Sequence, residues 1–278
     1  MSSLNIIGSK PPQSSYARNQ QWWSMQRYRI AMGGFALIML LAISSWGSGS
    51  TTTTKEAMAE MGETQSDGVV EKPSITMHDA GGISYYHCKG TSTATKEKPL
   101  VMLHGAAFTK ENWKTSGILD ELCQTTTTKR RLSVFAVDLP VSKTYQDLIQ
   151  FLEVLKSEGR ISAHVALVTP SASGKTMITW AAQAATVKQT LPKYIERWIP
   201  VAANAINMQP EENIQRLDGL LPILAIYGDQ DRPGKQSSER LQSLAGATVV
   251  ELSGRHPCYL DSPNEFVTEV VKFIEEGG

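Results

Sequence analysis

Residues 164–176 read His-Val-Ala-Leu-Val-Thr-Pro-Ser-Ala-Ser-Gly-Lys-Thr, and this stretch decides how the rest of the chain is interpreted. The apolar run 165–168 predicts a strand, and a helical pattern over 173–185 follows it directly. A strand that enters a helix through a sharp turn serves two kinds of site: a nucleophile elbow, which presents a serine, and a P-loop, which binds phosphate. Ser171 would act in the first and Lys175 in the second.

Strand and helix patterns alternate around this stretch. The predicted strands are 75–77, 83–88, 100–103, 132–137, 165–168, 198–202, 223–227 and 248–252, and the predicted helices are 113–122, 145–155, 173–185, 211–217, 236–244 and 265–276. The turn residues 79–82 join the first two strands into a hairpin. The pattern predicts an α/β fold: a mostly parallel sheet with an N-terminal hairpin and helices on both faces. Ligands bind such sheets at the carboxyl ends of the strands.

Three residues with complementary chemistry follow strand ends. A serine hydroxyl becomes a nucleophile when a histidine accepts its proton, and a carboxylate must orient that histidine. In hydrolases with this kind of sheet the chain order is Ser, then Asp or Glu, then His. Here the order is Ser171, Asp231 and His256. We therefore expect these three residues to form a catalytic triad, with Asp229 as the alternative acid.

A hydrolase of this kind also needs backbone N–H groups that stabilise the oxyanion. One expected donor is the amide of Ala172, which follows the serine. The other is the amide of Ala106, because Leu103-His104-Gly105-Ala106-Ala107 follows a strand and its small residues allow close approach of the backbone. The elbow itself is atypical, since Thr169 and Ser173 occupy the positions that are glycines in G-x-S-x-G.

Several strings together resemble the alpha/beta-hydrolase superfamily over roughly residues 75–275. They are Leu103-His104-Gly105 with Trp113, Val137-Asp138-Leu139-Pro140, Thr169-Pro170-Ser171-x-Ser173-Gly174, Ile226-Tyr227-Gly228-Asp229-Gln230-Asp231 and His256-Pro257-Cys258-Tyr259-Leu260-Asp261. Within the superfamily, the elbow and the last two strings resemble the group of alpha/beta hydrolase domain-containing protein 14. The resemblance implies a serine hydrolase with Ser171 as nucleophile, Asp231 as acid and His256 as base. One branch of that group has an N-terminal membrane anchor.

Two departures bear on the substrate. After Pro140 the group usually has a glycine-containing loop, whereas here residues 141–144 lead straight into a helix, so the resemblance does not define the substrate preference. The segment between strands 198–202 and 223–227 is too short for the lid domain of many alpha/beta hydrolases. An open site favours a small acyl ester, thioester or amide, or an acylated protein side chain, over a long lipid. Transfer of the acyl group to an acceptor other than water is also compatible with the mechanism.

Rival interpretations rest on fewer residues. A P-loop fits Gly174-Lys175-Thr176, but Thr169 stands where its first glycine belongs and Pro170 lacks an N–H donor. A catalytically silent hydrolase fold used as an interaction protein is the second alternative. Cys258 near His256 has no elbow and is expected to pack in the core. No cofactor is expected, and no metal site, because the histidines lack carboxylate or cysteine partners at ligand spacing.

The N-terminal quarter of the chain has a different character. Residues 1–29 carry Lys and Arg but no Asp or Glu, and residues 30–46 are all apolar, glycine or serine. This pattern predicts a cytosolic N-terminus and a transmembrane signal-anchor, which makes the chain a single-pass type II protein of the secretory pathway. A cleaved signal peptide, an organelle transit peptide and a buried core helix are the alternatives. Residues 47–73 predict a flexible linker, and 74–278 the hydrolase domain.

Composition excludes other classes. Lys plus Arg and Asp plus Glu both number 27 among 278 residues, so nothing in the charge favours nucleic acid as a partner. The three cysteines, Cys88, Cys123 and Cys258, lie far apart without a C-x-x-C pair. We expect free thiols, although one long-range disulfide remains open.

Overall fold

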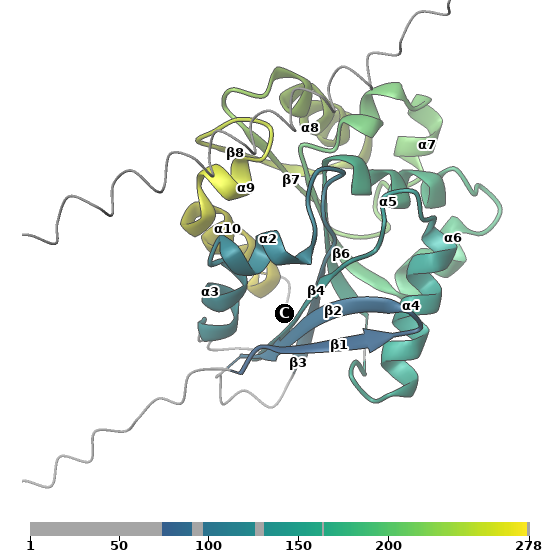
Figure 1. Cartoon of the computed structure of the whole chain (residues 1–278). Helices are drawn as coiled ribbons and strands as arrows, with labels where there is room; N and C mark the ends of the chain where they lie inside the picture. The colour runs from purple at the N-terminus through teal and green to yellow at the C-terminus, as the bar shows by residue number, and fades with distance from the viewer. Residues whose placement is uncertain (1–73, 91–96, 126–130, 163, 277–278) are drawn as a thin grey trace, which may run out of the picture. The chain divides into compact units, whose positions relative to one another are not determined.

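A computed structural model describes residues 74–90, 97–125, 131–162 and 164–276, and its centre is an eight-stranded sheet (Figure 1). The strand order is β1-β2-β4-β3-β5-β6-β7-β8. β2 runs antiparallel to its neighbours β1 and β4, and the other pairs are parallel. The strands are β1 (Thr76–Ala80), β2 (Ile83–Lys89), β3 (Glu97–Met102), β4 (Arg131–Val137), β5 (Val165–Pro170), β6 (Ile195–Val201), β7 (Leu224–Gly228) and β8 (Thr248–Leu252). The predicted hairpin and mostly parallel sheet are confirmed.

Helices cover both faces of the sheet, and each face has its own apolar core (Figure 1). One face packs against α4 (Tyr145–Ser157), α5 (Gly174–Ala181), α6 (Val187–Thr190), α7 (Glu211–Gln215) and α8 (Arg232–Ala245). The other packs against α2 (Lys110–Thr115), α3 (Ile118–Gln124), α9 (Cys258–Asp261) and α10 (Pro263–Glu275). Side chains alternate between the two cores along a strand, as Val101 and Met102 of β3 do. Because both faces are buried, the central strands are almost continuously apolar.

Two predicted helices differ from the structure. The single helix predicted over 113–122 is two short helices, α2 and α3, because the chain turns at Gly117, whose φ is 81°. Glycine adopts this left-handed conformation without steric cost, so the Ser-Gly pair at 116–117 was the signal for the break. The helix predicted over 173–185 begins instead as the 3-10 turn η1 (Ser171–Ser173) and ends at Ala181.

The cysteine prediction was wrong for two of the three residues. Cys88 of β2 and Cys123 of α3 form a disulfide, with their Cα atoms 6.0 Å apart. The bond joins an antiparallel strand to the helix that covers it, and the spacing of 35 residues gave no indication of the pair. Cys258 is free and buried, as expected.

The chain between β6 and β7 stays short. It contains the 3-10 turn η3 (Asn204–Met208) and α7, and a second 3-10 turn, η2 (Leu191–Lys193), precedes β6. Among the residues that the structure describes, no helix has the length and apolar character needed to cross a membrane. The predicted anchor at 30–46 and linker at 47–73 lie outside these residues.

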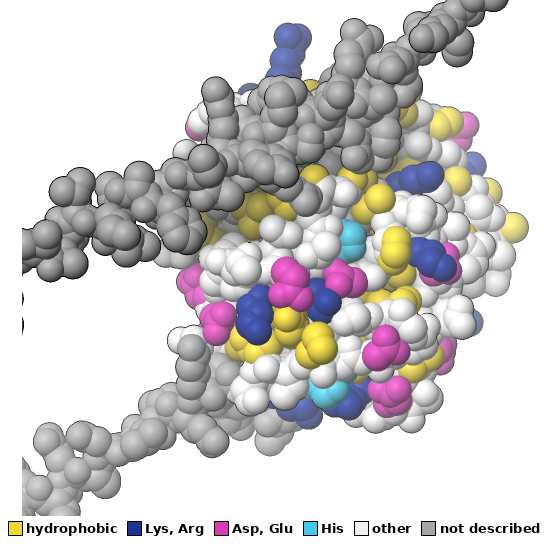
Figure 2. Space-filling model, in the orientation of Figure 1, with side chains coloured by type: hydrophobic (Ala, Val, Ile, Leu, Met, Phe, Trp, Pro, Cys, Tyr) yellow, Lys and Arg dark blue, Asp and Glu magenta, His cyan; other side chains and the backbone are white. Residues whose placement is uncertain are grey.

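Acidic and basic side chains are interspersed over the described part of the face in Figure 2. This distribution agrees with the equal numbers of acidic and basic residues in the chain.

Candidate active site

Ser171 occupies a strained turn at the carboxyl end of β5. Its φ is 52°, a left-handed conformation that is unfavourable for a residue with a Cβ by about 1–2 kcal/mol. The turn connects β5 through η1 directly to α5, so the serine stands at the top of the sheet and is half-buried. This is the strand, turn and helix geometry of a nucleophile elbow.

The atypical flanking residues of the elbow each form a buried hydrogen bond. Trp198 Nε1 donates to Thr169 Oγ1 at 2.8 Å, and Ser173 Oγ donates to the carbonyl of Pro170 at 2.8 Å. The Ser173 hydroxyl therefore bonds to a carbonyl of the turn itself, whereas the Thr169 hydroxyl accepts from a side chain of the neighbouring strand β6. The close approach that needs a glycine occurs one residue later, because a Cβ on Gly174 would lie 2.7 Å from the Cβ of Ala203. This shift explains why G-x-S-x-G is absent.

The structure brings Ser171, Asp231 and His256 together. His256 Nδ1 lies 2.7 Å from Asp231 Oδ2, and His256 Nε2 lies 2.8 Å from Ser171 Oγ. The carboxylate only accepts hydrogen bonds, so Nδ1 carries the proton and donates it. In the neutral ring Nε2 then has a free lone pair, which accepts the hydrogen bond of the serine hydroxyl. The arrangement can withdraw a proton from Ser171.

The environment of Asp231 distinguishes it from the alternative acid. The Asp231 side chain is 5% exposed and its carboxylate faces His256. A Cβ on Gly234 would lie 2.3 Å from Asp231 Oδ2, so glycine at this position makes room for the carboxylate. Asp229 instead accepts a hydrogen bond from the amide of Gly254 at 2.8 Å. Asp229 therefore fixes the loop that carries the histidine.

A second carboxylate, which the sequence analysis did not assign to the site, also holds the histidine loop. Asp261 Oδ2 accepts from the amide of Arg255 at 2.8 Å, and Arg255 Nη2 lies 2.7 Å from Asp261 Oδ1. The hydrogen bonds and charge of Arg255 lower the pKa of Asp261. Gly254 has a φ of 130° and its Cβ would lie 2.6 Å from that of Asp261, so the loop fits only with glycine there. In the sequence, the glycine and arginine directly before His256 were the available indication that this loop is held in a special conformation.

The loop after β3 approaches the serine closely. A Cβ on Gly105 would lie 3.7 Å from the carbonyl oxygen of Pro170 and 3.7 Å from the Cβ of Ser171. Ala106, the next residue, is exposed, and Ala172 follows the serine within η1 and is half-buried. The two residues predicted to supply oxyanion donors thus belong to two adjoining turns.

Other candidate residues have different surroundings. Burial raises the pKa of the Cys258 thiol to about 12, so this cysteine is protonated at neutral pH and is a poor nucleophile. Lys175 is exposed on the first turn of α5. The amide of Gly174, which a P-loop would direct at phosphate, bonds to carbonyls within η1. In the described part of the chain no three His, Cys, Asp or Glu side chains are grouped to hold a metal ion.

Curated relatives belong to one group of proteins. The chain is 31% identical over 191 residues to "Protein ABHD14A" of Danio rerio, a match that covers 64% of each protein. It is 27% identical over 188 residues to "Putative protein-lysine deacylase ABHD14B" of Homo sapiens, covering 63% of this chain and 82% of that protein. The match thus spans less than two thirds of the Danio rerio protein's length. No protein-family model matches the chain.

Solved structures share the fold. A CIB-like hydrolase from Thermoplasma acidophilum superimposes with a TM-score of 0.53 at 19% identity, covering 73% of this chain and 97% of that chain. Carboxylesterase CesB from Bacillus subtilis gives a TM-score of 0.51 at 13% identity, covering 74% and 93%. At these identities the comparison concerns the fold alone, and that fold is the one the sequence predicted.

Proposed function

Because the chain is a member of the alpha/beta-hydrolase superfamily that resembles the ABHD14 proteins, we propose that it is a serine hydrolase acting through an acyl-enzyme. The observation that carries the proposal is the continuous hydrogen-bonded chain from Ser171 through His256 to Asp231, with distances of 2.8 and 2.7 Å. The left-handed turn at Ser171 supports the same role.

In the proposed mechanism Ser171 Oγ attacks the carbonyl carbon of an ester, thioester or amide. His256 Nε2 takes the hydroxyl proton as the new C–O bond forms, and Asp231 stabilises the resulting imidazolium through Nδ1–H. The amides of Ala106 and Ala172 donate hydrogen bonds to the oxyanion. Collapse of the tetrahedral intermediate breaks the bond to the leaving group, which takes the proton from His256. Water, or another nucleophile such as a thiol, then gives its proton to His256 and attacks the acyl carbon. The bond between that carbon and Ser171 Oγ breaks, and Oγ takes the proton back from His256.

We expect the substrate to carry a small acyl group, either on a protein side chain or in a small ester. The short connection between β6 and β7, which contains only η3 and α7 across residues 202–223, supports an open site. The Homo sapiens relative has protein-lysine deacylase in its name. An acylated lysine side chain on a protein, or a small acyl ester, is therefore the proposed substrate class.

The proposed location of the hydrolase domain is an oxidising compartment of the secretory pathway. The disulfide between Cys88 and Cys123 supports this location, because such bonds form and persist mainly outside the cytosol. It agrees with the type II orientation that residues 1–46 predict. If the domain faces the lumen, cells should yield protein in which a maleimide reagent modifies these two cysteines only after reduction. Modification without reduction would contradict the location.

Labelling with a fluorophosphonate probe tests the proposed activity. The probe phosphonylates an activated serine, so the full chain should be labelled and Ser171→Ala should not. Lys175→Ala is the matched control within the same turn and should be labelled like the wild type. Absence of labelling in folded wild-type protein would favour a silent interaction module. Thermal stabilisation by Mg-ATP that Lys175→Ala removes would instead favour a nucleotide site.

A further inference from the structure

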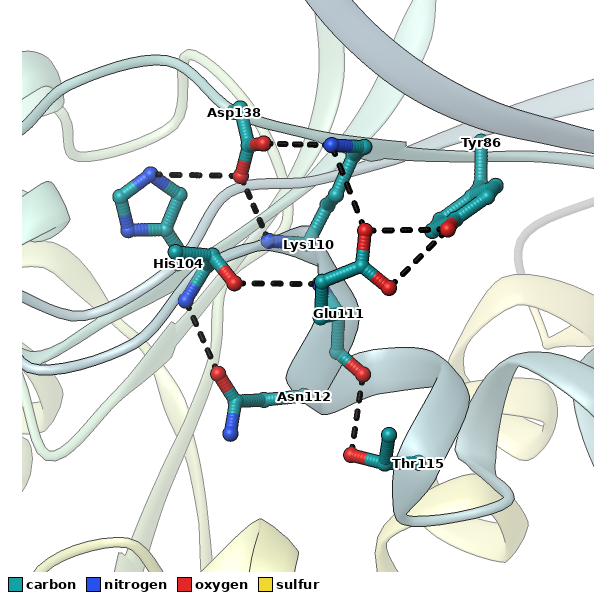
Figure 3. A network of polar contacts seen from close by, with 8 residues as sticks. Tyr86, His104, Lys110, Glu111, Asn112, Thr115 and Asp138 are labelled. Carbon is teal, nitrogen blue, oxygen red and sulfur yellow. Dashed lines mark hydrogen bonds and ion pairs between the residues drawn. The ribbon is translucent and has the colours of Figure 1, made fainter. Parts of the chain in front are cut away.

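Figure 3 shows a polar network that includes His104 and Lys110, which stand near the two ends of the loop after β3. Its centre is Asp138, the first residue after β4. Asp138 Oδ1 accepts a hydrogen bond from the backbone amide of Lys110 at 2.6 Å, and Asp138 Oδ2 accepts from Lys110 Nζ at 2.7 Å. Lys110 is the first residue of α2, where the loop that follows β3 ends. One carboxylate thus holds both the main chain and the side chain at this end of the loop.

The other end of the loop faces the same carboxylate. His104 Nε2 lies 4.0 Å from Asp138 Oδ1. The second ring nitrogen, Nδ1, is 2.9 Å from the carbonyl oxygen of Gly105. A carbonyl only accepts, so Nδ1 carries the proton and donates it. Nε2 faces the Asp138 carboxylate at 4.0 Å and forms an ion pair with it only when the ring carries both protons. His104, which Figure 3 shows facing Asp138, therefore also bonds to the backbone at Gly105.

The carbonyl of Gly105 determines the direction of the next amide. A trans peptide unit is planar, so the N–H of Ala106 points opposite to the C=O of Gly105. Two donors hold that carbonyl: His104 Nδ1, and the amide of Phe108 at 3.0 Å. Donation to a carbonyl also polarises its peptide unit and makes the N–H a stronger donor. Fixing one end of this unit consequently fixes the proposed oxyanion donor at the other end.

The lysine of the ion pair at the centre of the network is buried, whereas the side chain of Asp138 is 27% exposed. Lys110 is 7% exposed, and a second acid, Glu111, has Oε1 3.5 Å from its Nζ. Burial acts to lower the pKa of Lys110, but the hydrogen bonds and charges of Asp138 and Glu111 outweigh it and raise the pKa. Lys110 is therefore a cation at neutral pH. Tyr86 donates its hydroxyl to Glu111 at 2.9 Å and limits the movement of that acid.

A buried ion pair often adds little net stability, because desolvation offsets the attraction. Its geometric effect is better defined here, since Asp138 binds the main chain and side chain of Lys110 at the end of the loop after β3 and lies 4.0 Å from His104 at the start of that loop. We propose that Asp138, held by Lys110, is a positioning residue that orients the Gly105–Ala106 peptide toward the oxyanion formed on attack by Ser171. This inference rests on the proposed serine hydrolase function.

The test measures turnover of p-nitrophenyl acetate by the full chain, normalised to the concentration of sites that a fluorophosphonate titrates. Asp138→Ala should lower kcat by about 10- to 100-fold while KM changes by less than about threefold. Asp138→Asn should have a smaller effect, because its amide oxygen still accepts from the Lys110 amide. Asp147→Asn, which removes the exposed pair with Lys143, is the matched control and should leave kcat unchanged.

Affinity for phenylboronic acid separates positioning from general loss of structure. The boronate forms a tetrahedral adduct with the serine, so its affinity should fall by the same factor as kcat/KM in Asp138→Ala, Asp138→Asn and Lys110→Met. The inference fails if these variants are labelled and melt like the control yet keep the wild-type kcat and boronate affinity. It also fails if the variants lose thermal stability but keep the wild-type kcat and the wild-type affinity for the boronate. A wild-type protein that the fluorophosphonate does not label would instead refute the proposed function.

Discussion

The residues that follow β5 and β6 share the same unusual left-handed backbone conformation but have different roles. Ser171 follows β5 with a φ of 52°, and Ala202 follows β6 with a φ of 50°; they are the two non-glycine residues with positive φ in the described part of the chain. Ser171 is half-buried and its hydroxyl faces His256. Ala202 is 1% exposed and has only a methyl group. One turn presents a reactive group, whereas the other shapes its surroundings.

Contacts between the two turns explain the second role. Ala202 lies beside α8, where a Cβ on Gly234 would be 3.2 Å from its methyl group and 2.3 Å from the carboxylate of Asp231. Ala203 lies against the start of α5, close to Gly174. The turn after β6 thus sets the space available both to the elbow and to the acid. Strain at one position supports chemistry at its neighbour, which extends the idea that strained residues cluster at active sites.

The largest expected contrast is in activity. Ser171→Ala should lower kcat by at least about 10⁴-fold, because no other group can form the acyl-enzyme. Ala202→Gly should keep activity within about threefold of the wild type, since glycine adopts the same turn and the triad is untouched. Steady-state hydrolysis of p-nitrophenyl acetate measures both. Equal losses in the two variants would remove the distinction between the turns.

The next effect concerns the space beside the acid. Gly234→Ala should lower kcat by about 10- to 100-fold, because the new methyl group displaces the Asp231 carboxylate from His256. Ser243→Ala, an exposed change on the same helix, is the matched control and should leave kcat unchanged. Unchanged kcat in folded Gly234→Ala would show that the acid tolerates movement and that this packing does not support the site.

Packing between the turns predicts a compensating pair. Gly174→Ala should reduce the free energy of unfolding by about 1–3 kcal/mol, because its Cβ would overlap that of Ala203. In the Ala203→Gly background the overlap is relieved, and Gly174→Ala should then cost less than about 0.5 kcal/mol. Urea denaturation of the wild type, the two single variants and the double variant gives the coupling free energy between the two positions. Simple additivity of the two changes would contradict the proposed contact.

The smallest effect isolates the backbone strain itself. Ala202 and Ala203 are both buried, but Ala203 has an ordinary φ of −79°. Ala202→Gly relieves the left-handed strain and Ala203→Gly does not, so the second change should be more destabilising by about 1–2 kcal/mol. The same denaturation experiments provide the comparison. Equal destabilisation would indicate that Ala202 is not strained.

Sequence patterns predicted the features that depend on local order along the chain. Alternating strands and helices predicted the sheet, and the Ser, Asp, His order identified the three residues that the structure brings together. The remaining features depend on contacts between distant segments. Alanine seldom adopts a left-handed conformation, so no pattern indicates Ala202. Likewise, the spacing of Cys88 and Cys123 reveals no disulfide, and Asp138 gains its partners only when β4 lies beside β3.

The elbow illustrates both cases. Ser171 was recognisable from the strand before it and the helix after it, but its flanking Thr169 and Ser173 weakened the motif. Their hydrogen bonds to Trp198 and Pro170, and the displaced glycine at 174, explain how the turn forms without G-x-S-x-G. Trp198 lies on a neighbouring strand, so the local sequence could not indicate this partner.

Direct observation of the acyl-enzyme is the most stringent test of the central claim that Ser171 is the nucleophile. The full chain is mixed with p-nitrophenyl acetate, quenched in acid within the first turnovers, digested and analysed by mass spectrometry. We predict one acetyl group on Ser171 in the wild-type protein and no acetylated peptide from that turn in Ser171→Ala. Turnover accompanied by acetylation of a different residue, such as Lys175, and unaffected by Ser171→Ala would contradict the claim.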